Sequence, residues 1–170
     1  MNAGAYGSDW SEILVRARVV TADGAGWLTP SELGLSYRHS DLRHGQVVAV
    51  VEYQLVPRPP DEIKATVAEL IAQRKATQPT NKRTFGSVFK NPGEGPGAGR
   101  LIEECGLKEH RIGGALISPR HANFIENAGG ATSADCIALM IEARRRVRDA
   151  FGIELRHEVQ FLGPLALPDL

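Results

Sequence analysis

Glycine and proline dominate the middle of this 170-residue chain, from Gly86 to Gly99, and they limit the structures open to it. Both residue types disfavour long helices and central strands, so this stretch is predicted to be an irregular loop. The loop carries a hydroxyl, an ammonium and a carboxamide close together, on Ser87, Lys90 and Asn91. Such crowding of polar groups is typical of a substrate site. The alternative is a surface turn in which Ser87 and Asn91 bond only to nearby backbone.

The composition is that of an ordinary globular protein. Hydrophobic residues make up 42% of the chain, and the 20 basic residues balance the 20 acidic ones. The chain therefore has no net positive field that would attract nucleic acid or an anionic membrane in bulk, and we predict neither partner. An anionic ligand would have to be bound by local groups.

The cysteines and the apolar segments indicate the compartment. Cys105 and Cys136 lie in separate helical patterns without the spacing of a disulfide framework or a zinc site, so we predict two buried thiols and no metal. No apolar run reaches the ~18 residues of a membrane span, and no signal-like start is present. We expect a cytoplasmic protein, and the sequence indicates no obligate protein partner.

Residues 1–57 are predicted to be mostly strand. An alternating strand turns back at Asp23-Gly24, and the valine-rich run from Val47 to Val56 predicts a second, well-buried strand. Thr29 to Leu33 has the pattern of a helix start but is too short for more than a turn or two. The buried face of the first strand is expected to carry Ile13, Val15, Ala17 and Val19.

A proline-rich segment from Pro57 to Pro60 ends this part and marks the boundary to residues 58–170. Three amphipathic helices, two short strands and a final alternating strand from Ile153 to Phe161 are predicted there. We predict an α+β fold in which the helices pack on a small mixed sheet, and we expect the part from Asp61 onward to fold independently. The helix residues expected to face the core are Ile63, Val67, Leu70, Ile71, Leu101, Ile102, Cys105, Ile137, Met140, Ile141, Val147 and Phe151.

The ends of the second and third helices have clear signals. Gly106 and Gly152 are predicted to end them, and Thr132 or Ser133 to cap the start of the third. The four arginines near the end of the third helix are interpreted as a solvated helix end next to its negative dipole, and not as a nucleic-acid patch.

Several further segments share a pattern with the central loop, in the same order along the chain. Together with it they resemble the C-terminal part of the UDP-N-acetylenolpyruvoylglucosamine reductase family, also called UDP-N-acetylmuramate dehydrogenases. The segments are Asn2–Gly7, Tyr37–Ser40, Gly86–Lys108, Ser118–Asn127, Ala131–Asp135 and Leu155–Gly163. The resemblance implies that residues 1–57 are the C-terminal portion of an FAD-binding (PCMH-like) domain and residues 58–170 a substrate-binding domain. It also implies the subtype that lacks an additional tyrosine-bearing loop.

The resemblance implies a reaction in the synthesis of peptidoglycan precursors. NADPH would reduce bound FAD, and the flavin would give a hydride to UDP-N-acetylglucosamine enolpyruvate, yielding UDP-N-acetylmuramate. Hydride addition builds negative charge beside the substrate carboxylate, so the reaction needs a cation there and a proton donor. In the family pattern Arg38 grips the carboxylate, Ser87 donates the proton, and Glu158 orients and polarises the carboxylate end.

The family pattern also implies binding residues. Contacts with the substrate fall to Lys90, Asn91, His121 and Asn123, and contacts with FAD to Asn2, Ala3, Gly4, Ala5, Tyr6 and Gly7. Phe85 departs from the pattern, because a small residue is expected before Gly86. It would either narrow the loop or pack inward.

Alternatives remain for the function. Asn2–Gly7 reads as the middle of a loop, so we expect that Met1 is not the native start and that the chain is inactive without the rest of the flavin domain. Without the resemblance, the same segment would be a flexible tail. One alternative is a complete short protein that binds a UDP-sugar without turnover. Another is a flavin oxidoreductase of the same superfamily that acts on a different substrate.

Overall fold

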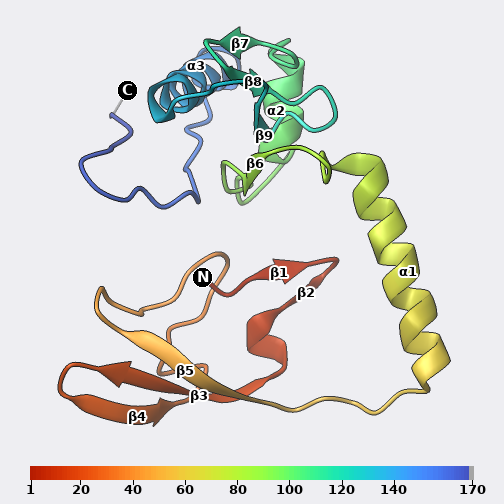
Figure 1. Ribbon diagram of the computed structural model, residues 1–170, viewed down its shortest axis with the longest axis vertical. Coiled ribbons are helices and arrows are strands. Elements are labelled where there is room, and N and C mark those ends of the chain that lie inside the picture. Colours follow the sequence, from red (N-terminus) through yellow and green to blue (C-terminus); the bar gives the residue numbers. More distant parts are fainter. Residues whose placement is uncertain (169–170) are drawn as a thin grey trace. The chain divides into compact units, whose positions relative to one another are not determined.

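The computed structural model describes residues 1–168, and the chain divides into two compact units (Figure 1). The first unit is Met1–Pro60, and the second begins at Asp61. The division falls in the proline-rich segment, where proline disfavours continuation of a strand. Each unit has its own hydrophobic cluster. The identification of the first unit with part of an FAD-binding domain stays a prediction.

The first unit is built from antiparallel strands. A small hairpin comes first, followed by a short 3-10 helix and a three-stranded sheet of order β4-β3-β5. The turn predicted at Asp23-Gly24 joins β3 and β4, with Thr21 paired to Gly24. Thr29–Leu33 forms a single turn, closed by a bond from the Leu33 amide to the Thr29 carbonyl. The elements are β1 (Gly4–Ala5), β2 (Ser8–Asp9), η1 (Trp10–Glu12), β3 (Leu14–Thr21), β4 (Gly24–Leu28) and β5 (Val47–Tyr53).

The prediction for the buried face of β3 was wrong at its start. Leu14, Ala17 and Val19 are buried, whereas Val15 is exposed. The pairing of β3 with β5 shifts register between Leu14 and Arg16. Such an irregularity inserts a residue into one strand, so the alternation changes face at that point.

The prediction that β5 is well buried was also wrong. Val48 and Val51 pack against the cluster of the first unit. Val47 and Val50, on the other face, are exposed, Val47 to 62%. A valine-rich run predicts burial on both faces, but within the first unit only one face of this sheet has a hydrophobic cluster.

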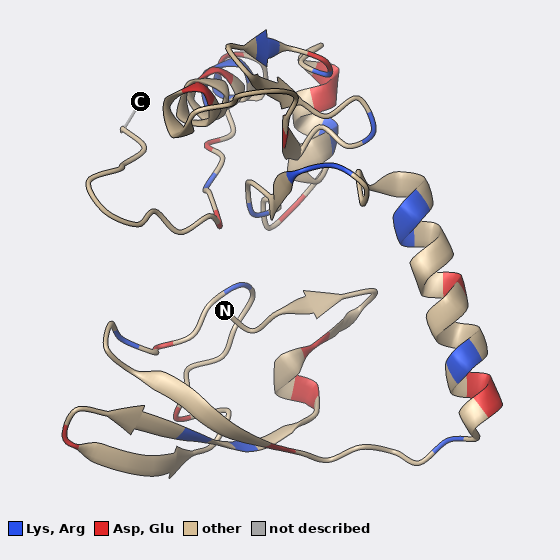
Figure 2. Cartoon of the chain, viewed as in Figure 1, with Lys and Arg blue, Asp and Glu red and all other residues tan. Residues whose placement is uncertain are grey.

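Helix α1 (Pro60–Thr77) starts at the boundary residue Pro60 and continues into the second unit, and none of its residues is buried. Its predicted core residues Ile63, Val67 and Ile71 are exposed, so the prediction of three core helices was wrong. Figure 2 shows basic and acidic residues interspersed along this helix. Near its end, the Arg120 guanidinium donates to the Lys75 carbonyl at 2.7 Å. The core of the second unit is complete without α1, because α2 and α3 fill it.

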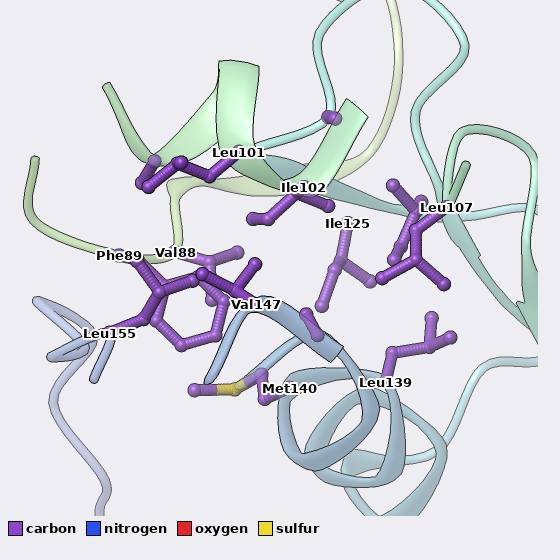
Figure 3. Close-up of a cluster of buried hydrophobic side chains, with 14 of the residues drawn as sticks. Val88, Phe89, Leu101, Ile102, Leu107, Ile125, Leu139, Met140, Val147 and Leu155 are labelled. Atoms are coloured by element: carbon purple, nitrogen blue, oxygen red, sulfur yellow. The ribbon is translucent and has the colours of Figure 1, made fainter. Parts of the chain in front are cut away.

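The remaining part of the second unit is a sheet with two helices, which confirms the predicted α+β combination. The prediction of a mixed sheet was wrong, because all three strand pairings are antiparallel. The sheet order is β6-β9-β8-β7. Figure 3 shows side chains of strands, loop and both helices pointing into one cluster. The elements are β6 (Thr84–Ser87), α2 (Ala98–Glu104), β7 (Arg111–Ile112), β8 (Ala115–Ile117), β9 (Phe124–Asn127) and α3 (Ser133–Phe151).

Helix α3 begins and ends as predicted. Thr132 is its N-cap in a reciprocal capping box with Asp135, and Gly152 ends it in the left-handed conformation. Its core residues are Leu139, Met140, Ala143 and Val147. Phe151, which was predicted to face the core, is exposed. The arginines of its second half pair with acidic neighbours, for example Arg146 with Glu142 at 2.8 Å.

The predicted final strand is replaced by an extended segment. Among the described residues it forms one isolated bridge, between His157 and Phe89. Leu155 is buried, and the alternating Ile153, Val159 and Phe161 are half-buried, as the pattern predicted. No helix of the described residues is long and apolar enough to cross a membrane.

Candidate active site

The predicted flavin-binding segment, residues 2–7, is not a tail, because it supplies the first strand and the turn of a hairpin that ends at Asp9. Gly4 and Ala5 pair with Asp9 and Ser8. The connecting residues Tyr6 and Gly7 have φ of 55° and 82°, as a tight two-residue hairpin turn requires.

The hairpin offers a surface that a flavin nucleotide could approach. Asn2 is buried, and its Oδ1 accepts from the Ser11 amide at 2.9 Å. Ala3, Ala5 and Gly7, by contrast, are exposed and have little or no side chain. Their backbone is therefore accessible, which fits the close approach of a cofactor.

Arg38 lies against this hairpin. Its Nη2 donates to the Gly4 carbonyl at 2.9 Å, and its guanidinium carbon lies 5.1 Å from the centre of the Tyr37 ring. Arg38 itself has φ of 51°, an uncommon conformation for a residue with a side chain. The structure thus brings the predicted carboxylate-binding arginine to the predicted flavin-binding segment, both within the first unit.

Ser87 is the last residue of β6 in the second unit, where it pairs with Phe124 of β9. It follows Gly86, whose φ of 85° favours glycine. The serine is half-buried, while the side chains of Val88 and Phe89 enter the core (Figure 3). The chain therefore leaves the sheet at Ser87 with its next two side chains anchored.

Glu158 reaches the same place from the C-terminal segment. Its amide donates to the Val88 carbonyl at 2.9 Å, and the Lys90 amide donates to the Arg156 carbonyl at 2.8 Å. These two bonds enclose the bridge between Phe89 and His157. Ser87 and Glu158, which are 71 positions apart in the printed sequence, thus belong to neighbouring backbone segments.

Asn91 holds the glycine-rich loop against α2. Its Oδ1 accepts from the amide of Ala98, the first residue of the helix, at 3.0 Å. Gly97, the N-cap residue, makes no side-chain cap bond, and a Cβ on it would lie 2.9 Å from the same Oδ1. Asn91 therefore serves as the cap that glycine cannot supply. Lys90 is half-buried beside it.

His121 is packed as a neutral imidazole. Its Nδ1 accepts from the Asn123 amide at 3.2 Å, and its ring lies edge-on to Phe124 with the ring centres 5.1 Å apart. Burial lowers the pKa of His121 below its ordinary value. Because Nδ1 accepts, the proton lies on Nε2, which makes that nitrogen the donor of the ring.

Asn123 is buried, and both polar atoms of its side chain contact the backbone of Phe89. Its Oδ1 accepts from the Phe89 amide at 2.9 Å, and its Nδ2 donates to the Phe89 carbonyl at 2.8 Å. The sequence pattern indicated a substrate contact at this position. It gave no sign of this bond to the loop, because the partner is backbone 34 residues away.

A cavity of about 480 Å³ lies elsewhere in the second unit, between β6, β9, the start of α3 and the C-terminal segment. Its mostly apolar lining includes Phe85, which is exposed, so this departure from the family pattern does not pack into the core. None of the predicted site residues lines it. In the part of the chain that the structure describes, no group of three or more His, Cys, Asp or Glu could hold a metal ion.

Comparison with known proteins identifies relatives of the whole chain. The family model for the C-terminal domain of UDP-N-acetylenolpyruvoylglucosamine reductase matches residues 78–162. A protein of that name from Anaeromyxobacter dehalogenans (strain 2CP-C) is 48% identical over 163 residues, which are 96% of this chain and 49% of the relative. One from Bacillus licheniformis is 42% identical over 96% of this chain and 90% of the relative.

A solved structure agrees with these matches. The crystal structure of UDP-N-acetylenolpyruvylglucosamine reductase from Thermus caldophilus matches with a TM-score of 0.81 and 39% sequence identity. The match covers 94% of this chain and 57% of that one. The chain spans about half the length of several of its curated relatives, 49% and 51% in two of them.

Proposed function

The chain belongs to the UDP-N-acetylenolpyruvoylglucosamine reductase family, and we propose that it carries the substrate-binding domain of such an enzyme. The resemblance predicted from the ordered segments is confirmed. The proposed reaction is the reduction of UDP-N-acetylglucosamine enolpyruvate to UDP-N-acetylmuramate with FAD and NADPH, for peptidoglycan precursor synthesis in the cytoplasm. Residues 1–57 would be the C-terminal portion of the FAD-binding domain.

One observation supports this proposal most. Ser87 and Glu158 are fixed on neighbouring backbone segments by bonds on both sides of Phe89. A serine that serves as a proton donor needs a fixed position, because a hydroxyl releases its proton reluctantly and general acid help depends on hydrogen-bond geometry. Glu158, whose backbone amide is held on the neighbouring segment, fits the predicted role in orienting the carboxylate end of the substrate.

The predicted flavin contacts are Asn2, Ala3, Gly4, Ala5, Tyr6 and Gly7. The exposed Ala3, Ala5, Tyr6 and Gly7 would face the cofactor, and the buried Asn2 would brace the segment through its bond from the Ser11 amide. When bound, FAD supplies the hydride chemistry, taking a hydride from NADPH and passing it to the double bond of the substrate. Arg38 would bind the enolpyruvyl carboxylate with its planar guanidinium, for which a lysine is no geometric substitute. This cation would stabilise the negative charge that builds on the carboxylate.

The residues of the second unit would complete the reaction. Ser87 would give a proton to the carbon next to the carboxylate, and Glu158 would orient the carboxylate end. Lys90 and Asn91 would contact the sugar or diphosphate, with Asn91 already fixed by α2. His121 would offer its Nε2 proton to a substrate oxygen, a role that suits an uncharged ring.

A chimaera tests the proposal. This chain would replace the matching half of the Anaeromyxobacter dehalogenans (strain 2CP-C) relative, which it matches at 48% identity. We expect NADPH oxidation that depends on UDP-N-acetylglucosamine enolpyruvate, with UDP-N-acetylmuramate as the product by mass spectrometry. A chimaera that holds FAD and binds the substrate without oxidising NADPH would favour the alternative of a binding module. Turnover with a different enol ether alone would favour another flavin oxidoreductase.

A further inference from the structure

The carboxamide of Asn123 occupies an unusual position beside the proposed proton donor. The residue is only 4% exposed, and its two polar atoms bond the amide and the carbonyl of the same residue, Phe89. This is the pairing that one residue of a strand makes with a residue of its neighbour. The Asn123 side chain therefore extends the β6-β9 ladder by one residue beyond the last backbone bonds.

The neighbouring hydrogen bonds show which backbone segments this extension connects. On the β9 side, Ser87 pairs with Phe124, and the Val88 amide donates to the Asn123 carbonyl at 2.9 Å. On the other side, the Val88 carbonyl accepts from the Glu158 amide. The Asn123 carboxamide thus fixes the middle of a segment that has Ser87 at one end and Glu158 bonded along its opposite edge.

We infer that Asn123 is a positioning residue that keeps Ser87 and Glu158 in register, and that it does not bind the substrate itself. The catalytic consequence rests on the proposed function, but the structural role does not. A carboxamide suits this position because it accepts and donates at once. Leucine can do neither. An ionised aspartate can only accept, and it would place a charge against the Phe89 carbonyl.

This requirement allows a test in which lowering the pH restores the missing hydrogen-bond donor. In Asn123→Asp the buried carboxyl has its pKa raised by burial and by the facing carbonyl. When protonated, it accepts from the Phe89 amide and donates to the Phe89 carbonyl, as the carboxamide does. The ionised form still accepts from the Phe89 amide, so the reporter is the Glu158 amide, which donates to the Val88 carbonyl. We expect its protection to be near that of the unaltered chain at about pH 5 and at least about tenfold lower at about pH 8. In Asn123→Leu it should be low at both pH values.

The measurement is NMR-detected hydrogen exchange on the 170-residue chain, with each rate divided by its intrinsic rate at the same pH. Asn127→Asp is the matched control, because Asn127 also lies on β9 and its Oδ1 only accepts, from the amides of Gly129 and Ala131. Asn127→Asp should leave the amide protection of Phe89 and Glu158 unchanged at both pH values. The Val147 amide in α3 reports whether each variant is folded. Equal protection of the Glu158 amide in Asn123→Asp and in the unaltered chain at about pH 8 would overturn the inference.

The chimaera adds the functional readout. The maximal turnover of Asn123→Asp, divided by that of the unaltered chimaera at the same pH, should rise as the pH falls, with a smaller change in KM. A ratio that stays flat while the amide protection changes would show that Asn123 is structural only, and would overturn its positioning role. If the unaltered chimaera has no activity, the proposed function fails, and hydrogen exchange still decides whether Asn123 holds the register.

Discussion

Gly99 lies where the site leaves no room for a side chain. A Cβ at this position would lie 2.7 Å from Cε1 and 3.1 Å from Nδ1 of His121. The ring of His121 is held by Phe124 and by the Asn123 amide, so it has little freedom to move. We predict that Gly99→Ala destabilises the second unit by about 1–3 kcal/mol, the cost of overpacking, measured by urea denaturation.

Two comparisons separate this contact from other effects. Gly93→Ala should change stability by less than about 0.5 kcal/mol, because a Cβ on Gly93 meets nothing within 4 Å. In a His121→Ala background, Gly99→Ala should lose its cost and gain up to about 1 kcal/mol, because alanine favours the helix. The same cost in both backgrounds would contradict the proposed contact.

The residues of the site differ in how far the sequence revealed their roles. Lys90 and Asn91 could be predicted as candidates because glycine and proline keep their segment out of regular structure. The loop predicted from Gly86 to Gly99 was wrong at its ends, because Ser87 closes β6 and Ala98 begins α2. Asn123 was found only through the family pattern. Its contacts with the Phe89 backbone depend on a strand pairing across 34 positions, which local residue patterns do not encode.

Helix α3 shows how one carboxylate connects two elements. Asp135 accepts from the Thr132 amide at 2.9 Å and from the Gly114 amide, next to β8, at 3.3 Å. The bond from the Thr132 amide is the main cause that lowers the pKa of Asp135, and the bond from Gly114 comes next. A lowered pKa means that the ionised carboxylate stabilises the fold above its ordinary pKa of 3.8, and that this contribution is lost as the pH falls through the folded-state pKa.

We predict that Asp135→Asn lowers the thermal midpoint of the second unit at pH 7, and that its difference from the unaltered chain shrinks as the pH falls below about 4. Thermal unfolding followed by circular dichroism across this range measures it. Asp61→Asn is the control, because the Asp61 carboxylate on α1 is 97% exposed and should leave the profile unchanged. A difference that is equal at pH 7 and at about pH 3 would show that the Asp135 charge contributes nothing.

Helix α1 differs, because its apolar residues recur at helical spacing but none of them is buried. Ile71 is exposed, whereas Leu139 of α3 is fully buried. We predict that Ile71→Gln changes the stability of the second unit by less than about 0.5 kcal/mol, and that Leu139→Ala lowers it by about 2–5 kcal/mol. Urea denaturation measures both. Comparable losses in the two variants would mean that α1 belongs to the core.

Elements with local end signals were predicted better than elements that depend on distant partners. The caps Thr132 and Gly152 lie at the ends of α3, as their residue types indicate. The valine-rich β5 and the final alternating segment were predicted wrongly in burial or regularity. An apolar pattern indicates which residues can be covered, but the covering element can lie anywhere in the chain or outside it.

At the scale of the whole molecule, the segment Asn2–Gly7 and the strands after it are the part of the chain that we propose contacts FAD. The chain spans about half the length of several relatives. We predict that the 170-residue chain alone does not hold stoichiometric FAD, because much of the cofactor surface would lack protein contacts. Gel filtration with flavin absorbance measures this, with the chimaera as the control that retains FAD. Co-elution of one FAD with each isolated chain would show that the first unit suffices.

The role of Ser87 is the central claim, and stopped-flow spectroscopy of the chimaera tests it most directly by separating the two half-reactions. In Ser87→Ala, flavin reduction by NADPH should keep its rate, because it requires no proton at the substrate carbon. Flavin reoxidation by saturating UDP-N-acetylglucosamine enolpyruvate should slow by about 10²-fold or more, the loss expected for a positioned general acid, and Ser87→Cys should recover part of that rate. An unchanged reoxidation rate in Ser87→Ala, with only weaker substrate binding, would contradict the role of Ser87 as proton donor.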